Sequence, residues 1–293
     1  MITVLANMQI NSEQRLSRLK HSFLSFDTIG DNWIINIRGI KRKQAVSFLK
    51  RRLKNRGIFF TLLDDDRGWS TNCLTMLKKS KYDHVLLWVE DHTNLQPQSV
   101  LKKLLQETIK NKVDFLSITW WIFGYKLQRL ANRKISLRRR KYISSVNFDI
   151  KSWNKFIDDS YHPYLIPMQG VFKKNLLVKL LCQDQLKWPL KLTGMVFMLA
   201  KLIKYFSPKT DPQVFFQQIN RLLGYHLPLY PKQTPYNVEL DYSRIDILPL
   251  KYAFPNREMF ASIDDDGFVE DYSLIHRGLY PPRKHKPKLS TKK

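Results

Sequence analysis

The sequence predicts an α/β protein whose largely parallel sheet is flanked by helices. Apolar runs of strand length alternate with amphipathic segments of helical period through the first 120 residues. At 293 residues with 43% hydrophobic content, the chain is long enough to bury a substantial core. Together these observations favour alternating strands and helices over an all-helical or all-strand protein.

The first predicted unit is a strand at 2–8, followed by a helix that Ser12 caps. Leu16, Leu19 and Phe23 recur at helical spacing and give that helix an apolar face. The same alternation predicts strands at 33–37, 58–63 and 84–89, and helices at 44–56, 70–80 and 94–111. Such a βαβ series builds a parallel sheet, because each helix returns the chain to the starting edge.

The pattern is looser in the second half. It predicts strands at 113–120, 142–149 and 164–168, and helices at 152–158, 173–181 and 211–223. Asp211-Pro212 is a strong helix start, and Gly170 is expected to break the chain before the helix at 173. Prolines become frequent between 227 and 255, which predicts extended chain that wraps the domain.

The net charge of +25 predicts an anionic partner: nucleic acid, acidic lipid or a phosphorylated small molecule. Cys73 and Cys182 are the two cysteines, so the sequence offers no disulfide framework or zinc knuckle and suits a reducing compartment. We find no signal peptide and no apolar run near the ~20 residues of a membrane span. We expect a cytoplasmic protein that can attach peripherally to a membrane through the apolar and basic segment at 195–206.

The most informative segment is the fourth strand, because its apolar run ends in Glu90-Asp91-His92. Open α/β sheets bind their ligands just beyond the carboxyl ends of parallel strands. These three residues therefore stand where a ligand or metal site is expected. The alternative is an acidic pair that begins a solvated turn.

This order of elements resembles the GT-A class of nucleotide-sugar glycosyltransferases over about residues 1–185. In that class an acidic cluster, written Asp-x-Asp or Glu-Asp-Asp, follows the fourth strand. The resemblance implies that Asp91 faces the ribose or a metal, and that the next residue ligates Mn²⁺ or Mg²⁺, which stabilises the diphosphate leaving group. Here His92 replaces the usual acid. It could ligate Mn²⁺, contact phosphate directly or belong to a metal-independent enzyme.

The resemblance also implies donor contacts at the strand ends and in the first helix. The residues are Ala6, Asn7, Met8, Arg15, Arg18, Asn36, Arg38, Asp64, Asp65, Glu90 and Asp91. For each arginine, a solvated helix face is the alternative. Near the C-terminus, His276 as a metal ligand and Arg277 on the diphosphate would close the site, unless His276 is an ordinary surface imidazole.

An inverting transferase needs a base to deprotonate the acceptor hydroxyl. The family places it downstream of an acceptor loop that Gln169-Gly170-Val171-Phe172 resembles. Asp184 is then the candidate base, with Asp158 and Asp159 as competitors and a helix cap or solvated turn as its alternative role.

The implied function is transfer of a sugar from a nucleotide-diphosphate donor to a hydroxyl of polysaccharide, lipopolysaccharide or glycoprotein glycan. The acceptor would be a glycan or lipid-linked, and an anionic membrane surface is a further partner. We expect a GT-A domain at 1–250, with a nucleotide-binding half at 1–120 and an acceptor half at 121–250. A helical or extended C-terminal extension at 251–293 would end in a mobile basic tail.

Two rival interpretations remain. Basic clusters at 41–56 and 129–141 suit a nucleic-acid-binding protein, but the chain has no RNP-like motif or basic zipper and its acidic strand ends repel phosphate. The second rival is a non-catalytic membrane-surface protein that retains a transferase-like fold.

Overall fold

The computed structural model describes residues 1–62, 68–118, 130–157, 166–182, 235–239, 247–263 and 273–280. The first half alternates strands and helices: β1 (Thr3–Gln9), α1 (Glu13–Phe26), β2 (Asn32–Arg38), α2 (Arg42–Leu53) with a 3-10 turn at Lys54–Arg56, β3 (Gly57–Phe60), α3 (Gly68–Leu77) and β4 (His84–Leu87). These elements confirm the alternation that the sequence predicts. Ser12 caps α1 by accepting a hydrogen bond from the Arg15 backbone N–H at 3.1 Å.

The second half is less regular. Its elements are β5 (His92–Asn94), α4 (Gln98–Lys110), β6 (Phe115–Ser117), β7 (Arg138–Arg139), β8 (Ile143–Phe148), α6 (Ile150–Ile157), β9 (Gly170–Lys173), α7 (Lys174–Leu181), α10 (Pro235–Glu239), β10 (Leu250–Pro255) and β11 (Phe260–Ser262). The helix expected at 211–223 lies outside the described residues.

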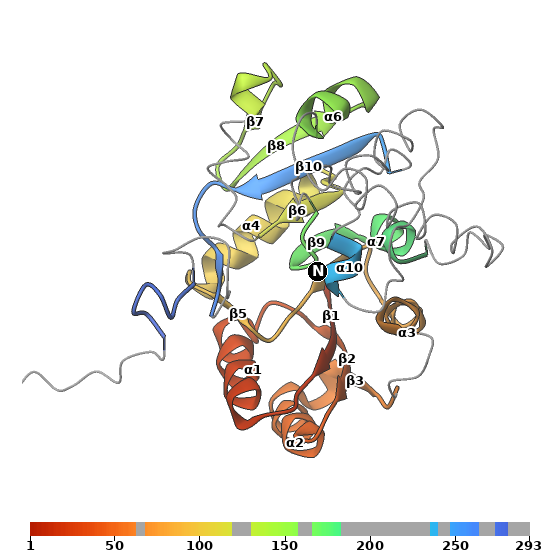
Figure 1. Cartoon of the computed structure of the whole chain (residues 1–293), viewed down its shortest axis with the longest axis vertical. Coiled ribbons are helices and arrows are strands. Elements are labelled where there is room, and N and C mark those ends of the chain that lie inside the picture. The colour runs from red at the N-terminus through yellow and green to blue at the C-terminus, as the bar shows by residue number, and fades with distance from the viewer. Residues whose placement is uncertain are drawn as a thin grey trace, which may run out of the picture.

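One nine-stranded sheet organises the molecule, in the order β3-β2-β1-β4-β9-β6-β10-β8-β7 (Figure 1). Seven of these strands run the same way; β9 is antiparallel to β4 and β6, and β8 is antiparallel to β10 and β7. The expected α/β fold with a mostly parallel sheet is therefore confirmed. The carboxyl ends of β1, β2 and β4 meet at one edge, which we call the carboxyl edge; the opposite one is the amino edge.

Helices cover both faces of the sheet, and each face has its own apolar core. Helices α1, α2 and α4 pack on one face, whereas α3, α6 and α7 pack on the other. The period of two in β1 explains this division: Val4, Ala6 and Met8 enter the first core, and Leu5 enters the second. A strand with both faces covered must be apolar on both sides, which is why β1 and β2 read as continuous apolar runs.

Of the strand expected at 164–168, residues 166–168 are described and form no strand; the strand that follows them is β9, at Gly170–Lys173. Gly170 does not break the chain; it lies inside the sheet between β4 and β6. A Cβ at this position would lie 2.5 Å from the Phe115 ring, so glycine permits a close approach of the strand to that ring.

The proline-rich segment at 227–255 was expected to wrap the domain, but its last part is β10, which lies between β6 and β8 in the sheet. The boundary expected at residue 250 therefore coincides with the start of a sheet strand. Alternating Tyr252 and Phe254 enter the core on the α3 face, which the proline content of the segment obscured.

Among the described helices, none has the length and apolar character that a membrane span requires.

Candidate functional site

The candidate site lies at the carboxyl edge, where the chain leaves β4 and continues through Glu90 and Asp91 into β5. The Trp88 backbone N–H still donates to the Leu5 carbonyl at 2.8 Å, so the sheet extends one residue beyond β4. The next N–H, of Val89, donates to the Gln169 side-chain oxygen at 3.0 Å. Gln169 comes directly before β9 and adjoins the acidic cluster, whereas Gly170, Val171 and Phe172 belong to β9 and do not form the expected loop.

Helix α1 fixes the chain on both sides of the cluster. The buried Trp88 indole N–H donates to Ser22 Oγ at 2.8 Å, and the Ser22 hydroxyl donates to the His92 carbonyl. One turn later, Ser25 Oγ accepts from the Asn94 backbone N–H at 2.9 Å. We call this arrangement the α1 clamp; it consists of Ser22, Ser25, Trp88, the His92 carbonyl and the Asn94 N–H.

Strand β11 holds the other side of the same segment. It pairs antiparallel with β5, and Ser262 lies opposite His92. The Ile263 backbone N–H donates to the Asp91 carbonyl at 2.6 Å. The backbone from Asp91 to Asn94 is thus bonded on two sides, which orients the Asp91 and His92 side chains without using their polar atoms.

Glu90 is buried and paired with a cation from α1. Its exposed fraction is 7%, and the Arg15 Nε atom lies 3.2 Å from its Oε1 atom. Arg15 also donates to the Gln9 carbonyl at 2.7 Å, which holds it at the end of β1. Burial raises the pKa of the Glu90 carboxyl to about 7; the charge of Asp91 adds to this rise and the Arg15 guanidinium opposes it.

Asp91 and His92 form a second polar pair. His92 Nδ1 lies 2.7 Å from Asp91 Oδ1, which assigns the Nδ1 proton to that hydrogen bond. Burial acts to raise the pKa of Asp91, but the charge and the hydrogen bond of His92 outweigh it, so the pKa of Asp91 lies below its ordinary value. The Asp91 side chain is 39% exposed and can reach a ligand.

These atoms define what the site offers a metal ion. Asp91 offers a hard carboxylate oxygen and His92 an imidazole group, a pair that Mn²⁺ accepts. No group of three or more His, Cys, Asp or Glu side chains capable of holding a metal occurs among the described residues. The donor set fits a cation whose remaining ligands come from substrate phosphates and water.

Asn7 and Asn36, which the resemblance predicts as donor contacts, lie opposite each other near the ends of β1 and β2. Asn36 Nδ2 donates to Asn7 Oδ1 at 2.9 Å, and Asn7 Nδ2 donates to the Trp69 carbonyl at 3.2 Å. Asn36 Oδ1 accepts from the Leu62 backbone N–H at 2.9 Å. Both amides therefore tie β1 and β2 to α3 and to the chain after β3, a positioning role behind the carboxyl edge.

The other predicted donor contacts divide into three groups. Ala6 and Met8 have buried side chains in the core beneath α1, so these side chains cannot contact a ligand. Arg38 ends β2 beside Gln9, and burial lowers its pKa. Arg18 is buried in α1. The donor candidates Asp64 and Asp65 lie outside the described residues, as do the candidate bases Asp158, Asp159 and Asp184.

The C-terminal candidates, His276 and Arg277, lie in a segment that is bonded to β11, the strand that pairs with β5. The Leu274 backbone N–H donates to the Ser262 carbonyl at 2.9 Å, which ties the segment at 273–280 to β11. Arg277 forms a two-pronged ion pair with Glu258, at 2.5 and 3.0 Å, so its guanidinium is committed to that carboxylate. The His276 Nδ1 atom lies 2.9 Å from Ser273 Oγ.

Ser22, Trp88 and Glu258 were missed as site residues by sequence reasoning. Trp88 is an apolar residue in an apolar run, and nothing local marks its indole N–H as a structural donor. Ser22 offers a weak signal, since it is a polar residue beside Leu19 and Phe23 on the apolar face of α1. A buried serine in such a position must find a partner.

No protein-family model and no curated protein sequence matches the chain. Among solved structures, it is similar to S. aureus TarS 1–349 in complex with UDP-GlcNAc, with 11% identity and a TM-score of 0.48 over 91% of this chain and 59% of that one. TarS 1–349 without that ligand gives 12% identity and a TM-score of 0.46, over 89% and 60%. Its complex with UDP gives 13% and 0.41, over 76% and 72%. The chain thus spans about 59–60% of the first two of these structures.

Proposed function

We propose that the chain is a GT-A glycosyltransferase that moves a sugar from a nucleotide-diphosphate donor to a hydroxyl of a cell-surface glycan. The observation that carries this proposal is the geometry at the end of β4. There an ion pair, Arg15 with Glu90, stands next to the Asp91–His92 pair, at the carboxyl ends of parallel strands. This edge is where open α/β sheets bind nucleotides.

In this proposal the residues at the carboxyl edge bind and orient the donor. Asp91 and His92 hold Mn²⁺ or Mg²⁺, and such an ion stabilises negative charge on the diphosphate leaving group. Arg15, 46% exposed and fixed by Glu90 and the Gln9 carbonyl, adds a guanidinium that can approach phosphate. The α1 clamp and the pairing with β11 hold the backbone from Asp91 to Asn94 in place, so the site needs little rearrangement when the donor binds.

The acceptor side of the proposal rests on the sequence. Asp184 acts as the base that removes the proton from the acceptor hydroxyl, in an inverting reaction. The acceptor is a glycan, free or lipid-linked, and the enzyme works in the cytoplasm with the option of attaching to an anionic membrane. His276 is proposed as a further metal ligand and Arg277 as a cation near the diphosphate. For Arg277, this role requires exchange of its Glu258 partner for phosphate.

The test is a thermal-shift panel of UDP, GDP, CDP and TDP, each with and without Mn²⁺. UDP-GlcNAc is a practical first sugar donor to include. We expect one nucleoside diphosphate to raise the Tm, and Asp91→Asn to abolish that rise. Lack of a response to all four nucleotides would refute the transferase proposal, whereas a response that does not depend on Mn²⁺ would refute only the metal.

A further inference from the structure

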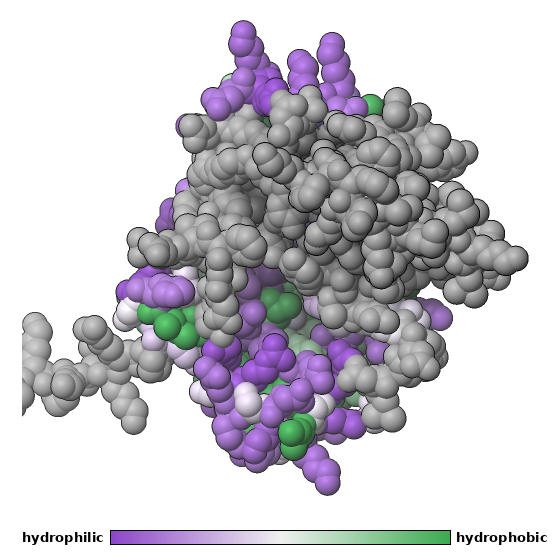
Figure 2. All heavy atoms as spheres, viewed as in Figure 1, coloured by the Kyte–Doolittle hydropathy of each residue, from purple (hydrophilic) through white to green (hydrophobic). Residues whose placement is uncertain are grey.

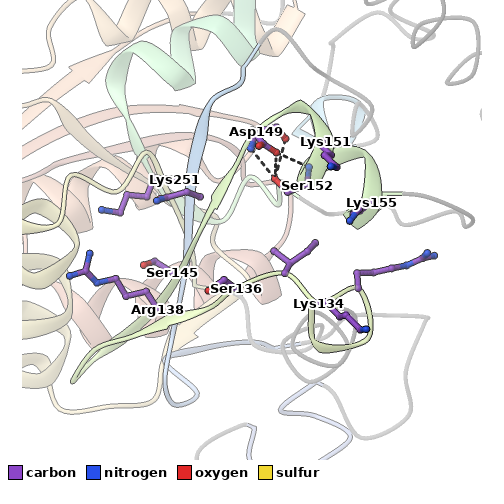
Figure 3. A pocket seen from close by; sticks show the side chains of 12 residues that line it. Lys134, Ser136, Arg138, Ser145, Asp149, Lys151, Ser152, Lys155 and Lys251 are labelled. Atoms are coloured by element: carbon purple, nitrogen blue, oxygen red, sulfur yellow. Dashed lines mark hydrogen bonds between the residues drawn. The ribbon is translucent and has the colours of Figure 1, made fainter.

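A strongly basic groove lies at the amino edge of the sheet, away from the candidate active site. Its first hollow has a volume of about 360 Å³ and lies between the chain before β7, strand β8 and helix α6 (Figure 3). Six cationic side chains line it: Arg133, Lys134, Arg138, Lys151, Lys155 and Lys251. The basic segment at 129–141 therefore contributes to a concave site with residues from α6 and β10.

A second hollow of about 520 Å³ continues from the first, because both are lined by Asn147 and Lys251. It adds Lys110 at the end of α4, Lys112 in the loop after this helix and Lys173 at the end of β9. We call the two hollows together the basic groove. Nine cationic side chains line it against two carboxylates, Asp149 and Asp114, so its lining carries a net charge of about seven positive units.

Both carboxylates are already used by the protein. Asp149 Oδ1 accepts from the Ser152 backbone N–H at 2.7 Å and from the Ser152 hydroxyl at 2.5 Å. Asp114 accepts from the Lys251 backbone N–H at 2.9 Å and lies 3.4 Å from Lys173 Nζ. The remaining cations far outnumber these acids, and charges of one sign gathered in a concavity attract counter-ions strongly.

The strand register places this groove at the opposite edge from Asp91. Lys173 lies opposite His84 at the start of β4, whereas Gly170 lies opposite Leu87 at its end. Lys251 is the second residue of β10, and it pairs with Asn147 of β8. An anion in the groove is therefore bound at the far edge of the sheet from the proposed donor site.

The lining indicates what kind of anion fits. Ser136, Ser145, Asn147 and Ser152 add hydroxyl and amide groups between the cations, which suits a ligand rich in oxygen. Phe148 is the aromatic residue of the lining, and its ring is buried, so no described ring in the groove is open to stack on a base. Ile150 is the one large exposed apolar residue of β7, β8, β10 and α6, which is a poor basis for insertion into a bilayer.

We propose that the basic groove binds a hydrated anionic glycan chain that carries phosphate or carboxylate groups. Two adjoining hollows suit an extended chain better than a single small anion. In Figure 2, hydrophilic side chains project at the top of the view, where Figure 1 places β7 and α6. The proposal goes beyond the transferase activity, because such a groove would hold a glycan whether or not the carboxyl edge binds a nucleotide.

The test measures binding to the full chain, without nucleotide or metal, by fluorescence anisotropy. The labelled probes are an oligogalacturonide, a phosphorylated mannan, a neutral dextran, a single-stranded oligothymidylate and vesicles of anionic lipid. The groove variant is Arg138→Gln/Lys151→Gln/Lys155→Gln, at three exposed positions. Its matched control, Lys43→Gln/Arg51→Gln/Arg52→Gln, removes the same charge from exposed positions of α2.

We expect the oligogalacturonide, the phosphorylated mannan or both to bind and the dextran not to bind. The groove variant should weaken binding about tenfold or more and reduce its salt dependence, because several ionic contacts are lost. The control variant should stay within about twofold of the unsubstituted chain. Asp91→Asn should leave binding unchanged, which separates this proposal from the transferase one.

Three results would overturn the proposal. The first is equal binding by the groove variant and the unsubstituted chain. The second is equal weakening by the groove and control variants, which would indicate attraction to the net charge alone. The third is binding confined to oligothymidylate or to vesicles, which would assign the groove to nucleic acid or to a membrane surface. Of the two glycan probes, the one that binds identifies the anionic group.

Discussion

The α1 clamp gives a prediction whose size follows from its contacts. Ser22→Ala removes one hydroxyl that both accepts from the Trp88 indole N–H and donates to the His92 carbonyl. Ser22 is fully buried and Trp88 is 1% exposed, so water cannot easily replace the lost partner. An unsatisfied buried donor costs ~1–3 kcal/mol, and loss of the second hydrogen bond adds ~1 kcal/mol. We expect a loss of about 2–4 kcal/mol in the free energy of unfolding.

The assay is thermal unfolding followed by circular dichroism, with Ser25→Ala as the matched control. Ser25 is only partly buried, so water can replace its bond to the Asn94 N–H and the expected loss is about 0.5–1.5 kcal/mol. A loss of 2–4 kcal/mol corresponds to a drop on the order of 5–10 °C in Tm. Equal Tm values for the two variants would refute the reasoning that Ser22 anchors this segment.

Three further predictions test other parts of the structure. Gly170→Ala should lower the free energy of unfolding in urea by about 1–3 kcal/mol, because the new methyl group meets the Phe115 ring at 2.5 Å. An unchanged midpoint of urea unfolding would contradict this packing. Burial raises the pKa of the Cys73 thiol to about 12. Iodoacetamide should therefore label Cys182 and spare Cys73 until the protein unfolds. Equal labelling rates of the two cysteines, measured by mass spectrometry, would contradict the burial of Cys73. Burial also lowers the pKa of His84 in the folded protein, so the unfolded chain binds the proton more readily and stability should fall as the pH drops below about 6.5. His84→Gln should flatten this part of the plot of stability against pH. An identical pH dependence in the variant would exclude His84 as its source.

The strands of the first half could be predicted because their signal is local. Residues 2–8 and 84–89 are apolar runs, and β1 lies between β2 and β4, two strands of the same alternation. Strand β10 gave no such signal, because its place between β6 and β8 depends on pairing with Phe115 and Val146, far away in the chain. Gly170 was misread for the same reason: its need for glycine comes from the Phe115 ring and not from a turn.

The candidate site divides in a similar way. Glu90, Asp91 and His92 are adjacent in the sequence and follow a strand, so their location could be predicted. Their supports could not, since Ser22 is 70 residues from His92, and Gln169 is 80 residues from Val89. The basic segment at 129–141 suggested nucleic acid, and only the structure brings it together with α6 and β10 in a groove.

The proposed function requires that Asp91 and His92 bind the diphosphate of a sugar nucleotide. Isothermal titration calorimetry tests it directly, with the nucleoside diphosphate that stabilises the protein best, in the presence and absence of Mn²⁺. We expect Asp91→Asn and His92→Ala each to weaken binding at least about tenfold, because a ligand to the bound cation is lost. The groove variant Arg138→Gln/Lys151→Gln/Lys155→Gln should bind as the unsubstituted chain does. Unchanged affinity in both Asp91→Asn and His92→Ala, or loss of affinity in the groove variant alone, would contradict it.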